Sequence, residues 1–298
     1  MEKLIVGARG SGLSLAQTNY LVGLLKKSVD ADFEVRIIKT AGDLDRASPL
    51  ASGWEQGIFT RAIETELLEG RIDLAVHSLK DLPLNQPEGL AVAAVPARAD
   101  PRDALVAAEK ILLDSDESLP LTKGASVGTS SPRRSALIKL ARPDLTILPL
   151  RGNLPTRLER IRKGELDGAV MAMAGIERLK PDLDGLRVVP LEPGLFVPAP
   201  GQGALAVELR LDHPRFEAVR NAANDLAAEA CVLLERRMLE MFGGGCSLPI
   251  GVLADKSGDD FILNGFRAGA HGSYWAQVYS PHPDEVLKML YERLRDPL

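Results

Sequence analysis

Six basic side chains stand where predicted strands end or predicted helices begin, which is where α/β proteins bind ligands. They are Arg9, Lys80, Arg133, Arg134, Arg151 and Arg157. Helix N-termini at this edge of a sheet also offer free N–H groups to anions. Arg133 and Arg134 fall in the first turn of a predicted helix, where positive charge opposes the helix dipole, so helix stability does not explain them. Because a guanidinium group pairs well with carboxylate or phosphate, the pattern predicts a polyanionic small molecule as ligand.

Asp81 stands beside Lys80 and is the candidate for acid–base chemistry. A carboxylate among cations favours its ionised form, and it can then stabilise a developing cation and exchange protons with it. A turn or helix-cap aspartate before Pro83 is the alternative interpretation. Nothing in the sequence arranges His77 and Ser78 with Asp81 as a catalytic triad, and we interpret His77 as structural.

Cys246, one of only two cysteines, follows three glycines and precedes Pro249 by three residues. Glycine leaves the backbone bare and free to adopt positive φ, so residues 243–251 are predicted to form a loop that ends the preceding helix. A thiol on such a loop has room for a bulky substituent. The alternative is a small buried side chain, and this is our interpretation of Cys231, which lies inside the predicted helix.

The composition of the chain disfavours several classes of function. The chain has 298 residues, a formal net charge of −5 and 4% aromatic residues, whereas nucleic-acid-binding domains are more often basic and rich in stacking side chains. Its four histidines are scattered, and it has no C-x-x-C or H-x-x-x-H motif, so we expect no metal site. Neither a G-x-x-x-x-G-K-[ST] loop nor a dinucleotide fingerprint is present, which disfavours nucleotides as ligands.

The start of the chain and its cysteine content predict a cytoplasmic protein. The first residues, Met-Glu-Lys, lead directly into an apolar run without the pattern of a signal peptide, and no apolar run reaches the length of a membrane span. Two cysteines without framework spacing indicate a reducing compartment. We expect a monomer with no nucleic-acid or membrane partner.

Apolar runs and helical patterns alternate along the chain, as is typical of parallel α/β sheets. Strands are predicted at 4–8, 33–38, 72–76 and 90–95, then at 125–128, 145–150, 167–171 and 204–209. Helices are predicted at 13–29 with Ser11 as cap, at 60–69, from Pro132 onward, at 155–163 and, as one long element, at 214–242. Strands at 261–267 and 274–279 and a helix at 283–294 complete the chain. Residues 41–57 are polar and turn-rich and are predicted to form a mobile loop.

An internal echo suggests two related halves. Glu69–Val76 and Lys163–Val170 are identical at four of eight positions, and each leads from a helix into a buried strand. We therefore predict two α/β domains like those of hinged periplasmic binding proteins, with a cleft between them, and a small α+β C-terminal domain. The expected boundaries are 1–98 with 198–216 for the first domain, 102–195 for the second and 219–298 for the third.

Five blocks of sequence, in order, closely resemble the hydroxymethylbilane synthase family, also called porphobilinogen deaminases. They are Val76–Pro83 (VHSLKDLP), Val127–Arg134 (VGTSSPRR), Leu150–Arg157 (LRGNLPTR), Pro200–Ala204 (PGQGA) and Gly244–Gly251 (GGCSLPIG). The resemblance covers the chain from about residue 5 to residue 251 and is looser beyond residue 253.

The resemblance implies a transferase of tetrapyrrole (heme) biosynthesis. Such an enzyme joins four porphobilinogen molecules head to tail with loss of ammonia and releases hydroxymethylbilane by hydrolysis. The chain grows on a dipyrromethane cofactor, which a thioether would join here to Cys246, and Asp81 matches the catalytic aspartate of the family. The resemblance implies a cofactor-binding set of Lys80, Asp81, Thr129, Ser131, Arg133, Arg134 and Arg151, and a substrate-binding set of Arg9, Ser11, Arg151 and Arg157. Each pyrrole ring carries two carboxylates, which agrees with the polyanion predicted from the basic residues.

One departure from the family pattern lies in the expected mobile loop. The family usually has lysine where this chain has Gln56. We expect altered product retention or turnover without loss of activity, so unchanged kinetics in Gln56→Lys would contradict this expectation.

Two other classes of function remain open at this point. A non-catalytic hinged receptor for an organic anion would have no need of a thiol on a glycine loop. A transferase of another class, with cysteine as nucleophile, would need a base near Cys246, and no histidine lies close to it in sequence. A two-pyrrole mass adduct on Cys246 would distinguish both from the reading implied by the resemblance.

Overall fold

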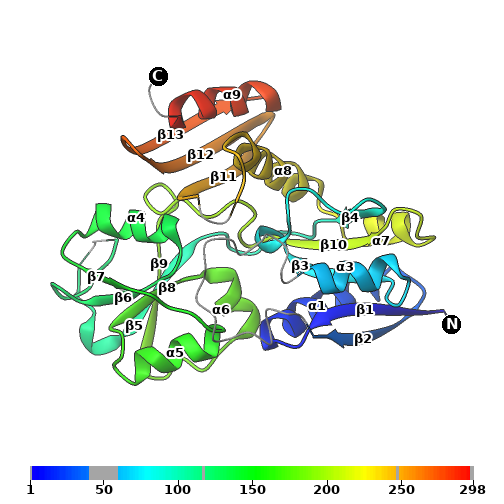
Figure 1. Ribbon diagram of the computed structural model, residues 1–298, viewed down its shortest axis with the longest axis horizontal. Helices are drawn as coiled ribbons and strands as arrows, with labels where there is room; N and C mark the ends of the chain where they lie inside the picture. Colours follow the sequence, from blue (N-terminus) through cyan, green and yellow to red (C-terminus); the bar gives the residue numbers. More distant parts are fainter. Residues whose placement is uncertain (1, 40–59, 116–117, 246–247, 296–298) are drawn as a thin grey trace. The chain divides into compact units, whose positions relative to one another are not determined.

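The computed structural model describes residues 2–39, 60–115, 118–245 and 248–295 (Figure 1). The chain forms two compact units, Met1–Ala99 with Ala204–Ala230 and Asp100–Gly203 with Cys231–Leu298. The predicted loop at 41–57 and the thiol of Cys246 lie outside the described residues. The division into three domains stays a prediction.

The first unit is built on a five-stranded sheet in the order β2-β1-β3-β10-β4. The strands are β1 (Lys3–Arg9), β2 (Asp32–Ile38), β3 (Leu74–Ser78), β4 (Leu90–Ala94) and β10 (Leu205–Arg210). β1 runs parallel to β2 and β3, whereas β10 runs antiparallel to its two neighbours, β3 and β4. The expectation of a wholly parallel sheet is therefore wrong at β10, which enters the sheet as the chain returns from the second unit.

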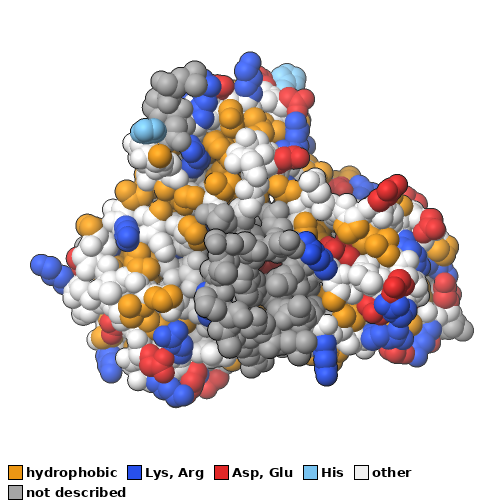
Figure 2. Space-filling view, viewed as in Figure 1, with side chains coloured by type: hydrophobic (Ala, Val, Ile, Leu, Met, Phe, Trp, Pro, Cys, Tyr) orange, Lys and Arg blue, Asp and Glu red, His pale blue; other side chains and the backbone are white. Residues whose placement is uncertain are grey.

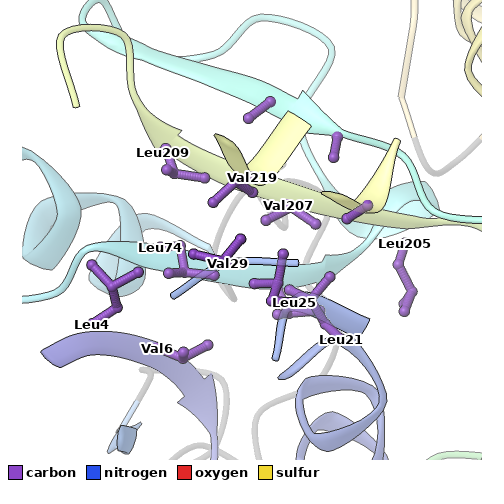
Figure 3. Close-up of a cluster of buried hydrophobic side chains, with 14 of the residues drawn as sticks. Leu4, Val6, Leu21, Leu25, Val29, Leu74, Leu205, Val207, Leu209 and Val219 are labelled. Carbon is purple, nitrogen blue, oxygen red and sulfur yellow. The ribbon is translucent and has the colours of Figure 1, made fainter. Parts of the chain in front are cut away.

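Among the described residues, the helices that lie wholly within this unit are α1 (Gly12–Leu25), α3 (Arg61–Leu68) and α7 (Phe216–Ala223). Side chains from α1, α7, β1, β3 and β10 meet in one buried cluster (Figure 3). Leu21 and Leu25 of α1 face Leu74 and Val207 of the sheet in this cluster. Burial of each such side chain is worth about 1.5–3 kcal/mol relative to exposure, and this is what fixes the helices on the sheet.

The second unit repeats the same sheet, in the order β7-β6-β8-β5-β9. The strands are β5 (Asp103–Ala108), β6 (Ser126–Gly128), β7 (Thr146–Leu148), β8 (Gly168–Ala172) and β9 (Leu186–Pro190). Again one strand, here β5, runs antiparallel to its neighbours at the fourth position. The helices α4 (Pro132–Ala141), α5 (Leu154–Arg162) and α6 (Met173–Leu179) connect the parallel strands. The prediction of two related α/β halves is confirmed by this shared topology.

The echo in the sequence marks the same structural device in both sheets. Asp73 accepts a hydrogen bond from the backbone N–H of Ile5 at 2.6 Å, and Asp167 accepts one from that of Ser126 at 2.7 Å. Gly70 and Gly164, three residues before each aspartate, both adopt positive φ and end the preceding helix. The repeated residues thus join a helix end to the start of the central strand.

A third, antiparallel sheet belongs to the second unit and consists of β11 (Ile250–Ser257), β12 (Asp260–Gly269) and β13 (Gly272–Ser280). The final helix, α9 (Pro283–Leu294), packs against β12 and β13. Leu253 and Phe266 of this sheet share a buried cluster with Leu105 and Val127 of the second sheet. The small C-terminal sheet expected from the sequence is confirmed, with β11 as a strand that the sequence did not indicate.

The prediction of one long helix at 214–242 is wrong, because α7 ends at Ala223 and a separate helix, α8 (Leu226–Met241), follows. Asn224 has extended backbone angles, and its side chain accepts a hydrogen bond from the Val95 N–H at 2.8 Å. Asp225 then accepts hydrogen bonds from the N–H groups of Ala227 and Ala228 as the new helix begins. The glycines after α8 adopt positive φ at 243, 244 and 245, as expected for a helix stop.

The described helices include none that is both long and apolar enough to cross a membrane. On the face shown in Figure 2, acidic and basic side chains are interspersed over the described residues. Exposed ion pairs such as Arg160–Glu165 contribute to this mixed surface. The basic residues singled out above must therefore be judged by their local surroundings.

Candidate functional site

Lys80 and Asp81 lie on a short 3₁₀ turn, η1 (Leu79–Asp81), that directly follows β3. Both side chains are exposed. The turn is anchored by its neighbours: the Leu79 N–H donates to the Ala204 carbonyl at 3.0 Å, and the Gln17 side chain donates to the Ser78 hydroxyl at 3.0 Å. A carboxylate and an ammonium group are thus presented to solvent on a fixed piece of backbone.

Buried ionisable groups support this turn from inside the first unit. His77 Nε2 lies 3.1 Å from Glu208 Oε2, and both side chains are almost completely buried. Glu64 is buried as well, and this burial raises the pKa of its carboxyl, with the charge of Glu208 acting in the same direction. The interpretation of His77 as a structural residue agrees with these contacts.

Arg9 ends β1, and Ser11 caps α1 two residues later. The Ser11 hydroxyl accepts a hydrogen bond from the Ser14 N–H at 3.3 Å, which confirms the predicted cap. The Ser14 hydroxyl in turn accepts one from the Arg9 N–H at 3.1 Å. Because β1 and β3 are parallel neighbours, Arg9 and the turn that carries Asp81 stand at the same edge of the sheet.

Thr129 and Ser131 connect β6 to α4 in the second unit. The Thr129 hydroxyl accepts a hydrogen bond from the Ser131 N–H at 3.2 Å, and the Ser131 hydroxyl caps α4 by accepting one from the Arg134 N–H. Pro132 occupies the first turn of this helix, as predicted. Both hydroxyl groups keep a proton that they can donate to an anion.

Arg133 and Arg134 point back from α4 to a single buried carboxylate, that of Asp103 on β5. Arg133 Nη1 donates to Asp103 Oδ2 at 2.8 Å and to the Val197 carbonyl at 2.7 Å. Arg134 Nη2 donates to Asp103 Oδ1 at 2.7 Å, and Arg134 Nη1 donates to the Val170 carbonyl at 3.0 Å. All three side chains are buried. The first turn of α4 thus holds two cations against their helix dipole by means of one acid.

The ionisation of this group follows from burial and pairing. Burial alone would raise the pKa of Asp103, but the charges of Arg133 and Arg134 outweigh it and hold that pKa well below its ordinary value. Burial lowers the pKa of Arg133, against the opposing effect of Asp103. Two guanidinium groups and one carboxylate leave a net positive charge on this three-residue group.

Arg151 and Arg157 lie on the neighbouring segment between β7 and the first turns of α5. Asn153 caps this helix by accepting a hydrogen bond from the Thr156 N–H at 3.0 Å, and Arg157 Nε donates to the Gly152 carbonyl at 2.8 Å. Burial lowers the pKa of Arg157, and the charge of Arg134 lowers it further. Arg157 therefore lies in the electrostatic field of the buried arginine group, whereas Arg151 is exposed.

The structure distributes the predicted site residues over two groups. Arg9, Ser11, Lys80 and Asp81 belong to the first unit, and Thr129, Ser131, Arg133, Arg134, Arg151 and Arg157 belong to the second. Cys246 is assigned by sequence to the second unit but lies outside the described residues. Their ligand-binding roles stay predictions.

Sequence reasoning missed Asp103 and Gln202, which hold the buried arginines. Gln202 Nε2 donates to Asp103 Oδ1 at 2.8 Å. A charged residue at the start of the apolar run Asp103–Ala108 was a weak signal for the first, because a buried acid needs a partner. Nothing in the pattern around Gln202 indicated its contact. Among the described residues, no group of three or more histidine, cysteine or acidic side chains could hold a metal ion.

Family models and individual relatives both match this chain to porphobilinogen deaminases over most of its length. The family model described as "Porphobilinogen deaminase, dipyromethane cofactor binding domain" matches residues 4–218, and "Porphobilinogen deaminase, C-terminal domain" matches residues 229–272. The porphobilinogen deaminase of Roseiflexus sp. (strain RS-1) is 42% identical over 273 residues, which cover 91% of this chain and 88% of the relative. That of Oceanobacillus iheyensis is 39% identical over 297 residues, which cover 99% of this chain and 94% of the relative.

Solved structures give weaker likenesses. The periplasmic VFT2 domain of Bordetella pertussis BvgS aligns with a TM-score of 0.42 at 13% identity, over 74% of this chain and 85% of that domain. CbnR, a LysR family transcriptional regulator, aligns with a TM-score of 0.45 at 13% identity, over 75% of this chain and 71% of its own. Likenesses this weak support no conclusion about this chain.

Proposed function

Because this chain belongs to the porphobilinogen deaminase family, we propose that it joins four porphobilinogen molecules head to tail, with loss of ammonia, and releases hydroxymethylbilane. The growing chain is held on a dipyrromethane cofactor through a thioether to Cys246. The proposal includes a monomeric cytoplasmic enzyme of the three-domain type expected from the sequence.

The net positive charge around Arg133 and Arg134 is the observation that carries this proposal. These side chains share one carboxylate, and the neighbouring Arg157 adds a further cation. Dipyrromethane and porphobilinogen carry acetate and propionate groups, so the donors present fit the chemistry of the cofactor and of the substrate. A pairing of this kind is favourable because a charge-assisted hydrogen bond is worth about 1.5–3 kcal/mol.

The residues of the second unit bind and orient carboxylates in this proposal. Arg133 and Arg134 have their guanidinium directions fixed by Asp103 before any ligand arrives, which lowers the entropy lost on binding. Thr129 and Ser131 donate hydroxyl protons at the start of α4, where the helix dipole also favours an anion. Arg151 and Arg157 bind further carboxylates from the start of α5.

The residues of the first unit act on the reacting pyrrole. The bound dipyrromethane supplies a nucleophilic pyrrole carbon as the primer for condensation. As ammonia leaves, positive charge develops on the substrate pyrrole, and the Asp81 carboxylate stabilises it and handles the pyrrole N–H proton. Lys80, Arg9 and Ser11 bind substrate and cofactor carboxylates beside it. The short turn after β3 fixes the position of Asp81 through the backbone contacts of Leu79.

Intact mass spectrometry of the purified protein tests the cofactor and its point of attachment. We expect the wild-type mass to exceed the sequence mass by a two-pyrrole adduct, and Cys246→Ser to remove this excess. Cys231→Ser is the matched control, because Cys231 is buried on α8 and should leave the adduct in place. An active wild-type protein of unmodified mass would refute the covalent cofactor, and an adduct that survives in Cys246→Ser would refute its attachment site.

A further inference from the structure

Asp103 is the only acid among the described residues that forms an ion pair with Arg133 or Arg134. The arginine side chains are 4% and 9% exposed, and the aspartate side chain is 0% exposed. Within the part of the chain that the structure describes, these two buried positive charges share one ion-pair partner, at a cost in desolvation. A neutral pair would avoid this cost, so the excess charge requires an explanation outside stability.

Position 202 is where one further carboxylate would remove the excess charge. Gln202 Oε1 lies 3.4 Å from Arg134 Nη2, and Gln202 Nε2 donates to Asp103 Oδ1 and to the Pro101 carbonyl, each at 2.8 Å. Glutamate has nearly the same size as glutamine but carries a negative charge. The Gln202 amide therefore gives Asp103 Oδ1 a further hydrogen-bond donor and links this carboxylate to the Pro101 carbonyl. Because the amide is neutral, it does not balance the charge of the arginines.

We propose that Gln202 is a positioning residue that keeps the Asp103–Arg133–Arg134 group at net positive charge, so that a carboxylate of the bound pyrrole chain becomes its missing counter-charge. Gln202 touches the arginine group from the Pro200–Ala204 segment, far in sequence from α4, and acts on the ligand only through that group. The inference rests on the proposed function, since it assumes that the anion bound here belongs to the pyrrole chain.

The first test is Gln202→Glu, with cofactor loading as the readout. Unloaded protein, made in cells that cannot synthesise porphobilinogen, is incubated with porphobilinogen, and intact mass gives the rate at which the adduct forms. The Asp103–Arg133–Arg134 group has a net positive charge, so a glutamate carboxyl beside it is ionised at neutral pH and cancels that charge. We expect Gln202→Glu to load about tenfold or more slowly than wild type at about pH 7.5.

Gln277→Glu is the matched control, because Gln277 is exposed on β13 and the substitution adds the same charge outside the cluster. It should load at the wild-type rate. Gln202→Met keeps the size of the side chain without adding charge, so it should load faster than Gln202→Glu. Equal rates for the two variants, or a wild-type rate for Gln202→Glu, would mean that charge at this position does not matter and would overturn the inference.

Arg134→Met decides the matter if Gln202→Glu does not fold. The variant leaves a neutral Arg133–Asp103 pair in which both aspartate oxygens keep a donor, Arg133 Nη1 on Oδ2 and Gln202 Nε2 on Oδ1. We expect loading to drop about tenfold or more, while the melting temperature of the unloaded variant falls by less than about 5 °C or rises. A larger fall would show that the second cation is already balanced in the unloaded protein and would overturn the inference.

The failure of this inference and that of the proposed function can be told apart. If wild-type protein never acquires the two-pyrrole adduct, the proposed function fails. If wild type is loaded and Gln202→Glu loads no more slowly than wild type or Gln202→Met, only the role of Gln202 fails.

Discussion

Asp81 and Asp103 are aspartates with opposite surroundings and different work. Asp81 is exposed on a turn after β3. Asp103, on β5, is fully buried and pairs with Arg133 and Arg134 of α4. An exposed carboxylate can reach a substrate, whereas a buried and paired one can only direct its partners. The two positions should therefore separate loss of turnover from loss of stability.

Asp81→Asn should lower turnover while leaving the cofactor adduct in place. Asparagine keeps the size of the side chain but has no charge to stabilise a cation and is a poor proton acceptor. We expect kcat to fall about 10²- to 10⁴-fold. Steady-state kinetics and intact mass on the same preparation check this, and near-normal turnover would remove Asp81 from the chemistry.

Asp103→Asn should destabilise the protein by about 3–5 kcal/mol, because it leaves two buried guanidinium groups without a counter-charge. Urea unfolding of the unloaded protein measures this cost. Asp100→Asn is the matched control: Asp100 pairs with Arg102 in a partly exposed ion pair, whose loss should cost about 1 kcal/mol or less. Equal costs for both variants would show that the buried group is not held by Asp103.

Glu64 predicts a dependence of stability on pH whose sign follows from its raised pKa. Its folded-state pKa lies above the ordinary 4.5, so the stability that it contributes is present below pH 4.5 and is lost as pH rises through the folded-state pKa. The glutamine in Glu64→Gln does not titrate. The melting temperature of this variant should therefore rise relative to that of wild type from about pH 4 to about pH 8.

Glu66→Gln on the same helix is the control for Glu64, and its sign is opposite. A hydrogen bond from Arg71 lowers the pKa of Glu66, so its stabilising contribution is present above pH 4.5 and lost in acid. The melting temperature of Glu66→Gln should therefore fall relative to that of wild type as pH rises. A Glu64→Gln curve with the same slope as the Glu66→Gln curve would contradict the assigned effect of burial.

At the scale of elements, Gly251 fixes how closely β11 approaches the segment that follows β9. A Cβ atom at this position would lie 2.4 Å from the Val197 carbonyl oxygen, so the backbone would have to move. Gly251→Ala should cost about 1–3 kcal/mol in urea unfolding. Gly194→Ala is the control, since a Cβ there meets no atom within 4 Å. An undiminished stability in Gly251→Ala would mean that β11 shifts freely.

Most elements could be predicted from sequence, because apolar periodicity and capping residues act locally. Ser11, Ser131 and Pro132 stand at the helix starts that they predicted. The break between α7 and α8 escaped prediction because it depends on a hydrogen bond from Val95, more than a hundred residues away from Asn224. The antiparallel direction of β5 and β10 also could not be predicted from local sequence. Strand direction depends on the side from which the chain enters the sheet, which is a property of the whole fold.

The candidate site was predictable in its cations and less so in their support. Arg133 and Arg134 were singled out because they oppose a helix dipole, and the structure gives them a buried partner. That partner, Asp103, comes from β5, which β8 separates from β6 in the sheet, and Gln202 comes from a loop. Such supports depend on tertiary contacts, which no local pattern reports.

At the scale of the whole molecule, the two sheets share one plan that even preserves an ion pair with its charges exchanged. Glu66 receives hydrogen bonds from Arg71 in the first unit, and Arg160 donates to Glu165 at the matching place in the second. The ion pair is equally attractive when acid and base exchange places. In both units it therefore links the end of the helix to the turn that follows. The likeness between the halves therefore lies in interactions more than in residue identities.

The position of β10 between β3 and β4 has a consequence for synthesis on the ribosome. The first sheet lacks its fourth strand until residue 210 has been made, whereas the strands of the second sheet lie within residues 103–190. A domain usually folds when its last strand emerges, so the N-terminal sheet should close after the second one. Proteolysis of nascent chains stalled with β9 but not β10 outside the ribosome should cleave within residues 1–99 and spare residues 103–190. Protection in the reverse order would show that the first sheet closes without β10. If β10 is required, the sheet that begins the chain becomes native after the sheet that follows it in the sequence.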